Sequence, residues 1–349
     1  MAERADRLRR LVMDAGRITG ADQLLQPWLG GMGAILMLHR VTDDLRFPEG
    51  PNRHLSISPR FLDQVLAALR EDGFLFVSMD EAVERLRAGN AGGPRFVALT
   101  ADDGYRDNLT EALPVLERHA APITVYVAPG LIEGRADLWW DVIEQAVNVG
   151  RPIGLGGETL LCDTPDAKRD AFHRLLATVN RDVPEGERTA FVRGIARDVG
   201  VDHDLPRRET LMMWEDLEGF ARHPLVTIGA HTVHHHNLKR LGKAEARFEL
   251  EEGRRLIAGR LGRAPRHFAY PYGFAEAVGA REVALAREAG YLSAVTTRHG
   301  ILREEHLGHL HALPRLSLNG RFQNLAHLRT MLRGLTTPLA NGGRRLVTV

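Results

Sequence analysis

The sequence has little cysteine, almost no excess charge and no long apolar run. Cys162 is the one cysteine among 349 residues, so no disulfide can form within the chain and no oxidising compartment is required. We expect Cys162 to be a small packed residue. Lys and Arg number 46 against 45 Asp and Glu, and this balance argues against a nucleic-acid partner.

The chain also lacks the features of membrane insertion and secretion. No stretch approaches the roughly 20 apolar residues of a transmembrane helix. The charged N-terminal segment, residues 1–16, lacks the apolar run of a signal peptide. We therefore expect a soluble, cytoplasmic protein without a transmembrane segment; the sequence does not indicate its oligomeric state.

What the sequence does contain is a regular alternation of short apolar runs and helical patterns. Continuous apolar strands between helices are typical of parallel strands buried on both faces, and about seven of them favour an α/β barrel. The predicted strands are residues 34–38, 74–77, 96–100, 123–127, 226–229, 267–270 and 292–296.

The remaining segments suggest additions to this barrel. We assign residues 1–30 to an N-terminal helical extension, 31–335 to the barrel and 336–349 to a C-terminal tail. Residues 139–213 are mostly helical in pattern, with loops near 154–157 and 184–186, and predict a helical insertion between two barrel strands.

Reactive side chains follow several of the apolar runs. His39, the pair Asp102–Asp103, His231 with His235, and the segment 270–273 each stand just after a predicted strand. Catalytic groups of α/β barrels come from the carboxyl ends of the strands, so we expect these residues to meet.

The adjacent carboxylates Asp102 and Asp103 would repel each other if both faced inward without a cation. A metal ion resolves this, because one carboxylate can bind it while the other accepts a proton. The alternative is a turn or a helix cap, both of which favour Asp.

His231 and His235 are four residues apart, so on a helical turn they would share a face. The alternative is an exposed histidine-rich loop. Two imidazoles and one carboxylate form a ligand set that leaves positions for water and substrate. The Tyr270-Pro271-Tyr272-Gly273 segment predicts either a loop that aims a backbone N–H at an oxyanion or an ordinary turn.

These three segments resemble the motifs of the NodB-type polysaccharide deacetylases, carbohydrate esterase family four. The family's T-F-D-D-G motif matches residues 100–104 (TADDG), and H-[ST]-x-x-H matches residues 231–235 (HTVHH). The third motif, R-x-x-P-Y, matches residues 268–272 (FAYPY), where Phe268 takes the place of the arginine.

The resemblance implies a distorted (β/α) barrel that binds one divalent metal ion, usually zinc. Asp103, His231 and His235 would be its ligands, and Asp102 the general base; cobalt, nickel or manganese would suit the ligands similarly. The implied reaction removes N-acetyl groups from oligo- or polysaccharide containing N-acetylglucosamine, using metal-activated water. The backbone N–H of Tyr272 would help to stabilise the oxyanion.

Two departures from the family pattern leave roles to fill. Arg315, in the late segment LPRLSL, is our candidate to replace the missing arginine beside the base. The late segment that supplies the general acid is not clear, and His311 or His39 are candidates for it, with His309 near the former.

Trp139 and Trp140 follow the fourth predicted strand and, with Pro271 and Tyr272, could contact the substrate, although aromatic residues more often belong to a core. Two other functions stay open. One is a related amidohydrolase that cuts another C–N bond. The other is a non-catalytic carbohydrate-binding protein on the same barrel.

Overall fold

The computed structural model describes residues 10–11, 13–89, 93–321 and 323–349. Within these residues, seven parallel strands close into a barrel in the order β1-β12-β11-β10-β9-β6-β5, with β5 pairing back onto β1. The strands are β1 (Gly33–Leu38), β5 (Phe96–Ala101), β6 (Ile123–Val127), β9 (Val226–Ala230), β10 (His267–Ala269), β11 (Ser293–His299) and β12 (Leu313–Ser317). The predicted α/β barrel is confirmed.

The prediction that residues 74–77 form a strand of the barrel ring was wrong. β4 (Leu75–Val77) pairs with β5 but lies outside the closed ring, and Leu75 on it is 39% exposed. The seventh place belongs to β12, which pairs with β1 and β11. A search for apolar runs overlooks β12 because Pro314 and Arg315 interrupt it, although Arg315 is fully buried.

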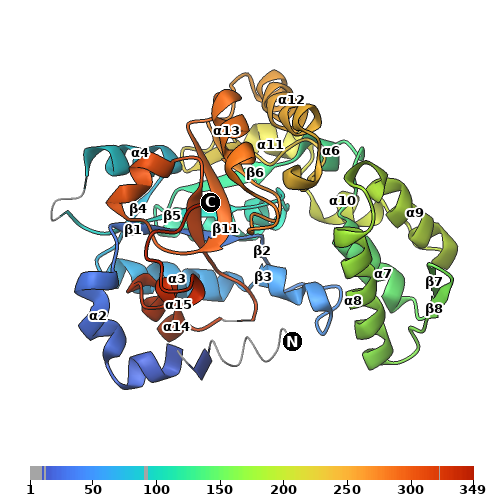
Figure 1. The fold of residues 1–349 in the computed structure, drawn as a ribbon, viewed down its shortest axis with the longest axis horizontal. Coiled ribbons are helices and arrows are strands. Elements are labelled where there is room, and N and C mark those ends of the chain that lie inside the picture. The colour runs from blue at the N-terminus through green and yellow to red at the C-terminus, as the bar shows by residue number, and fades with distance from the viewer. Residues whose placement is uncertain (1–9, 12, 90–92, 322) are drawn as a thin grey trace.

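Helices cover the outside of the ring (Figure 1). α3 begins after Ser58 and α4 after Ser78, and each serine accepts a hydrogen bond from a backbone N–H in the first turn. The helices around the barrel are α3 (Pro59–Glu71), α4 (Met79–Ala88), α5 (Leu113–Arg118), α11 (Trp214–Phe220), α12 (Lys243–Leu261), α13 (Ala280–Glu288) and α14 (Leu325–Leu332). Their apolar faces and the strands form the main core, except that α4 packs into a smaller cluster with other residues of the strands.

Residues 129–210, most of the segment between β6 and β9, form a lobe beside the barrel, on the right in Figure 1. It has a hydrophobic cluster of its own that includes Phe172, Leu175 and Val192. Its elements are α6 (Pro129–Ile132), α7 (Trp139–Asn148), β7 (Ile153–Leu155), β8 (Glu158–Leu160), α8 (Pro165–Arg181), α9 (Arg188–Val199) and α10 (Leu205–Thr210). Cys162 is buried within this lobe.

The lobe contains a β-hairpin where we predicted a loop. β7 and β8 pair in antiparallel fashion, and the two residues between them, Gly156 and Gly157, both have positive φ. A two-residue turn with positive φ at both positions matches the twist of the two strands, and glycine adopts it without strain. The two strands are only three residues long each, so they show little periodicity.

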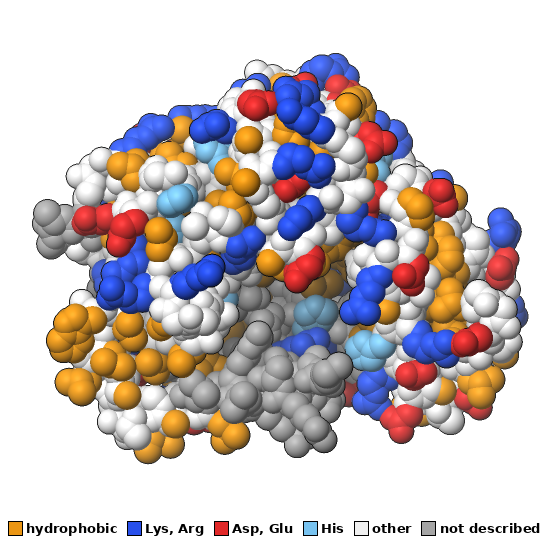
Figure 2. Space-filling view, viewed as in Figure 1, with side chains coloured by type: hydrophobic (Ala, Val, Ile, Leu, Met, Phe, Trp, Pro, Cys, Tyr) orange, Lys and Arg blue, Asp and Glu red, His pale blue; other side chains and the backbone are white. Residues whose placement is uncertain are grey.

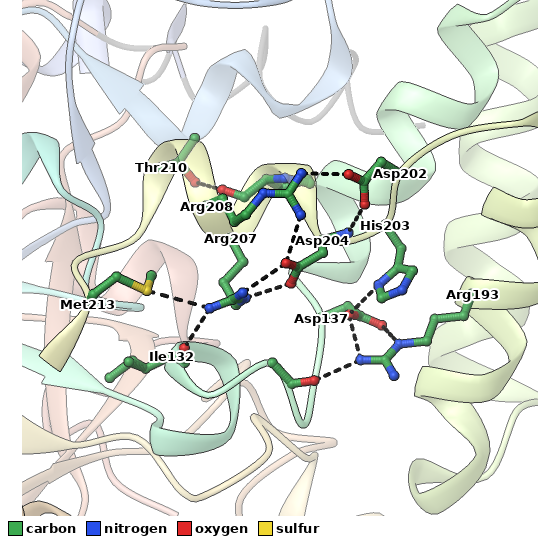
Figure 3. A network of polar contacts seen from close by, with 12 residues as sticks. Ile132, Asp137, Arg193, Asp202, His203, Asp204, Arg207, Arg208, Thr210 and Met213 are labelled. Carbon is green, nitrogen blue, oxygen red and sulfur yellow. Dashed lines mark hydrogen bonds and ion pairs between the residues drawn. The ribbon is translucent and has the colours of Figure 1, made fainter.

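A polar network fastens the lobe to the chain that leaves β6 (Figure 3). Arg193 of α9 donates to both oxygens of Asp137, at 2.9 and 3.1 Å. Arg207 of α10 donates to the backbone oxygen of Ile132 and forms two hydrogen bonds with Asp204. These contacts hold α9 and α10 against the segment that leads into α7.

Segments near the two ends of the described chain are in contact, since Arg345 donates to the backbone oxygen of Trp28. α2 (Ala21–Leu29) packs beside α14, and α15 (Thr336–Ala340) follows α14. The first nine residues of the predicted N-terminal extension lie outside the described residues. Among the described residues, no helix combines the length and the apolar character needed to cross a bilayer.

Candidate active site

Asp103, His231 and His235 meet at the carboxyl ends of β5 and β9, all three buried. Asp103 Oδ1 lies 3.6 Å from His231 Nε2 and 3.3 Å from His235 Nε2. His231 Nδ1 donates to the backbone oxygen of Ala269 at 2.7 Å, which turns its other ring nitrogen toward Asp103. The three residues predicted as metal ligands are therefore brought together.

The local backbone explains how they converge. Asp103 has φ of 70°, and Thr232 and His235 have φ of 64° and 57°. These left-handed conformations turn the chain sharply after each strand. His231 and His235 thus meet across a loop, closed by a hydrogen bond from His235 N to Thr232 Oγ1, and not on the helical turn that we considered.

The electrostatics of this group fit a divalent cation. Burial lowers the pKa of His231 to about 4 and that of His235 to about 3, so both rings are neutral and keep a lone pair. Burial raises the pKa of Asp103, and the nearby His39 and His231 offset this in part. Within the described residues, Asp103 Oδ1 has no hydrogen-bond donor. A buried carboxylate oxygen that faces two neutral imidazoles lacks a positive charge, which a cation would supply.

Asp102 points to a different partner. Arg315 Nη1 and Nη2 donate to its two oxygens at 2.7 Å each, and Arg315 Nε donates to the backbone oxygen of Thr296. Burial raises the pKa of the Asp102 carboxyl, but the charge and hydrogen bonds of Arg315 lower it more, to well below its usual range. Asp102 is therefore a carboxylate at neutral pH. Phe268, at the position of the family's arginine, is a core residue.

Glu249 of α12 holds the loop that carries the two histidines, and the sequence reasoning missed it. Its Oε2 accepts the backbone N–H groups of Val233 and His234 at 2.9 Å each, and its Oε1 lies 2.6 Å from His234 Nδ1. His236 Nδ1 lies 3.5 Å from the same oxygen. The one feature that could have indicated this role is an acidic residue on the face of α12 that is otherwise apolar and buried.

A second buried pair, Glu185 and Arg188, reaches the site from the lobe and was also missed. Arg188 Nη1 donates to the hydroxyl of Tyr272 at 2.6 Å, and Nη2 donates to Glu185 Oε1 at 2.5 Å. Glu185 Oε2 accepts the backbone N–H of Asn237, just beyond the second histidine. In the sequence this pair belongs to a charged stretch next to Pro184, which we interpreted only as a loop.

A cleft of about 1450 Å³ opens over these residues, between the barrel and α8. Figure 2 shows histidine and basic side chains in this hollow. The predicted site residues that line it are His39, Asp102, Asp103, Trp139, Trp140, His231, His235 and Tyr272.

The aromatic residues of the cleft are firmly held. Trp139 Nε1 donates to the hydroxyl of Tyr272, and Trp140 Nε1 donates to that of Tyr105. Trp139 and Trp140 are only 4% and 8% exposed, so they offer edges to the cleft and most of their surface to the core. Pro271 is buried and does not line the cleft.

The two histidines considered as general acid lie in different places. His39 lines the cleft near Asp102 and Asp103. His311 does not reach the cleft: it precedes β12, at the opposite end of the barrel strand, and its Nε2 bonds to the backbone oxygen of Tyr291. The prediction of a role for His311 is therefore wrong by position, because the amino end of a parallel strand lies away from the site. Its neighbour His309, in the turn before β12, does not line the cleft either.

A family profile described as polysaccharide deacetylase matches residues 89–160 and 183–294, more than half of the chain. The poly-beta-1,6-N-acetyl-D-glucosamine N-deacetylase of Escherichia coli K12 is 31% identical over 97 residues. That alignment covers 28% of this chain and 14% of the E. coli protein.

Solved structures share the fold. The Streptococcus pyogenes deacetylase PplD in complex with acetate has a TM-score of 0.58 and 18% identity, over 86% of this chain and 99% of that one. IcaB from Ammonifex degensii has a TM-score of 0.53 and 19% identity, over 86% of this chain and 98% of that one.

Proposed function

This chain belongs to the polysaccharide deacetylase family, and from that premise we propose that it removes N-acetyl groups from saccharides containing N-acetylglucosamine, with one divalent cation. One observation carries the proposal: two neutral imidazoles and an unpartnered carboxylate oxygen converge beside a second, ionised carboxylate. A water activated between a cation and a base is a recurrent way to hydrolyse an amide.

Asp103, His231 and His235 would hold the cation. Two nitrogens and one oxygen suit zinc, and cobalt, nickel and manganese accept similar ligands. When bound, the cation supplies Lewis acidity to a carbonyl oxygen and to a water molecule.

Asp102 accepts the proton of the attacking water. Each oxygen of Asp102 uses one lone pair to accept a hydrogen bond from Arg315 and keeps a second lone pair free. The ion pair also fixes the direction in which the carboxylate points. Asp102 lines the cleft, so a water there is within its reach. The oxygen of this water bonds to the acetamide carbon, and its proton moves to Asp102.

The C–N bond then breaks, and the amine nitrogen of the sugar takes up a proton as acetate leaves. His39 is the candidate donor, because it lies at the cleft beside both aspartates. Burial lowers the pKa of its imidazole, so His39 first takes up the proton that Asp102 accepted from the water and then passes it to the amine. The backbone N–H of Tyr272 is the candidate donor to the oxyanion. Tyr272 has φ of 65°, and Arg188 and Trp139 hold its side chain in place.

The size of the cleft favours an oligomeric or polymeric substrate over a small one. Its volume of about 1450 Å³ exceeds the roughly 300–1,000 Å³ of pockets for small ligands. Trp139 and Trp140 border it and offer apolar edges to sugar rings.

Acetate release tests the proposal. The chain, loaded with zinc, should release acetate from chitooligosaccharides or from poly-β-1,6-N-acetylglucosamine, and Asp102→Asn should bind as much zinc but release none. Asp43→Asn, which changes an exposed carboxylate, is the control and should keep full activity. No acetate from either substrate by the zinc-loaded chain would contradict the proposal. His39→Asn should also lose activity at unchanged zinc content.

A further inference from the structure

Helix α2 is inverted relative to an ordinary surface helix, whose apolar stripe faces the core. Its one buried residue is Asp22, which forms an ion pair with Arg333 at 2.6 Å and accepts a hydrogen bond from Thr330. Leu24 and Trp28 of the same helix are 71% and 60% exposed. The polar residue therefore anchors α2, and its large apolar residues point to solvent.

These side chains belong to a larger exposed surface, which we call the α2 patch. The helical turns that precede α2 add to it, and Gly16 in those turns packs against Leu335, next to α15. Figure 2 shows hydrophobic side chains gathered over α2, at the lower left. The patch consists of Leu11, Ile18, Leu24, Leu25, Trp28 and Leu339. An apolar surface of this kind marks a site of interaction.

Positive charge borders the patch. Arg345 donates to the backbone oxygen of Trp28, and Arg17, Arg344 and Arg345 are all exposed. The acidic side chains of residues 10–30 are Asp14 and Asp22, which lie in ion pairs with His327 and Arg333, and residues 335–349 contain none. The border therefore favours an anionic partner.

We propose that the α2 patch docks this protein onto the surface of an anionic lipid bilayer. Exposed tryptophan and leucine flanked by arginine is the composition of a segment that lies in the membrane interface. Each arginine near an anionic bilayer adds electrostatic attraction to it. A second copy of the chain fits less well, because two such patches face to face would bring their arginines together. The proposal does not depend on the deacetylase activity.

Sedimentation with vesicles tests the docking. The full 349-residue chain is mixed with vesicles of phosphatidylcholine alone or of phosphatidylcholine with phosphatidylglycerol. We expect binding to the anionic vesicles and at least about tenfold weaker binding to the neutral ones. The double variant Leu24→Ser/Trp28→Ser should weaken binding by at least about tenfold, because it removes two of the largest apolar side chains.

Leu161→Ser is the matched control, because Leu161 is 59% exposed but lies after β8 in the lobe. It should bind as the unchanged chain does, and Arg344→Gln/Arg345→Gln should lose only the preference for anionic vesicles. Absence of binding to either vesicle would overturn the proposal, as would equal binding by the double variant. A concentration-dependent dimer that the double variant abolishes, without vesicle binding, would assign the patch to a second copy and would also overturn it.

Discussion

Arg315 holds both oxygens of Asp102 at 2.7 Å inside the barrel. The two residues come from β12 and from the end of β5, the two neighbours of β1 in the ring. Arg315 is 1% exposed and Asp102 is 3% exposed, so each charge has lost most of its water and depends on the other. The pair thus connects the closure of the barrel with the position of Asp102, the proposed base.

Arg315→Lys should lower acetate release by at least about tenfold, because one ammonium cannot match both carboxylate oxygens. Zinc content should stay unchanged, since Arg315 contacts no predicted ligand. Arg329→Lys is the matched control, because Arg329 also donates to both oxygens of a carboxylate, that of Asp72, through its Nε and Nη2 and nearer the surface. Equal losses in both variants, or none in Arg315→Lys, would refute the role of the buried pair.

Arg188→Met should lower the free energy of unfolding by about 3–5 kcal/mol, because it leaves the Glu185 carboxylate buried without this partner. Adding Glu185→Gln should restore part of that loss. Urea unfolding measures both variants. Arg197→Met, on the same helix α9 but exposed and paired with the exposed Asp198, should cost clearly less. If Arg188→Met lowers the free energy of unfolding no more than the control variant does, the Glu185–Arg188 pair does not stabilise the contact between the lobe and the barrel.

Glu249→Gln should weaken zinc binding by roughly 10–100-fold, the usual effect of losing a residue that orients metal ligands. The amide oxygen of the variant can still accept a hydrogen bond from the backbone, but it lacks the negative charge that holds the loop 233–236 in place. Glu251→Gln changes an exposed glutamate of the same helix and serves as control. Zinc titration by calorimetry decides, and equal affinities for the two variants would contradict the assignment.

The sequence predicted those parts of the site that are close along the chain or fixed by strand ends. The run of apolar strands predicted the barrel. The aspartates and the histidines were predicted because each group directly follows one of these strands. Glu249, Glu185 and Arg188 were missed because each acts across a contact between separate elements, which spacing does not reveal. His311 was misplaced because a run of residues does not show which end of a strand it joins.

Glu144 predicts a dependence of stability on pH. Burial raises the pKa of its carboxyl from 4.5 to about 7, although the backbone N–H of Asn52 donates to it. The folded state therefore holds this proton more tightly than the unfolded state. Its contribution to stability is present below pH 4.5 and is lost as the pH rises to about 7.

Glu144→Gln should remove this dependence, because an amide does not titrate. The difference between the original chain and the variant in the free energy of unfolding should change by about 3 kcal/mol between pH 4.5 and 7.5, at 1.36 kcal/mol per pKa unit. Urea unfolding at both pH values measures it, with the exposed Glu84→Gln as control. A difference that stays constant with pH would contradict the raised pKa.

The most direct test of the account is a zinc titration of the metal-free chain and of two histidine variants. The unchanged chain should bind one ion tightly at the proposed site, and His235→Gln should weaken that binding by at least about a thousandfold, since it removes one of three protein ligands. His236→Gln alters the neighbouring histidine, which lies with His234 and Glu249 in a separate group, and should retain tight binding. Tight binding that survives His235→Gln but is lost in His236→Gln would place the cation elsewhere and contradict the account.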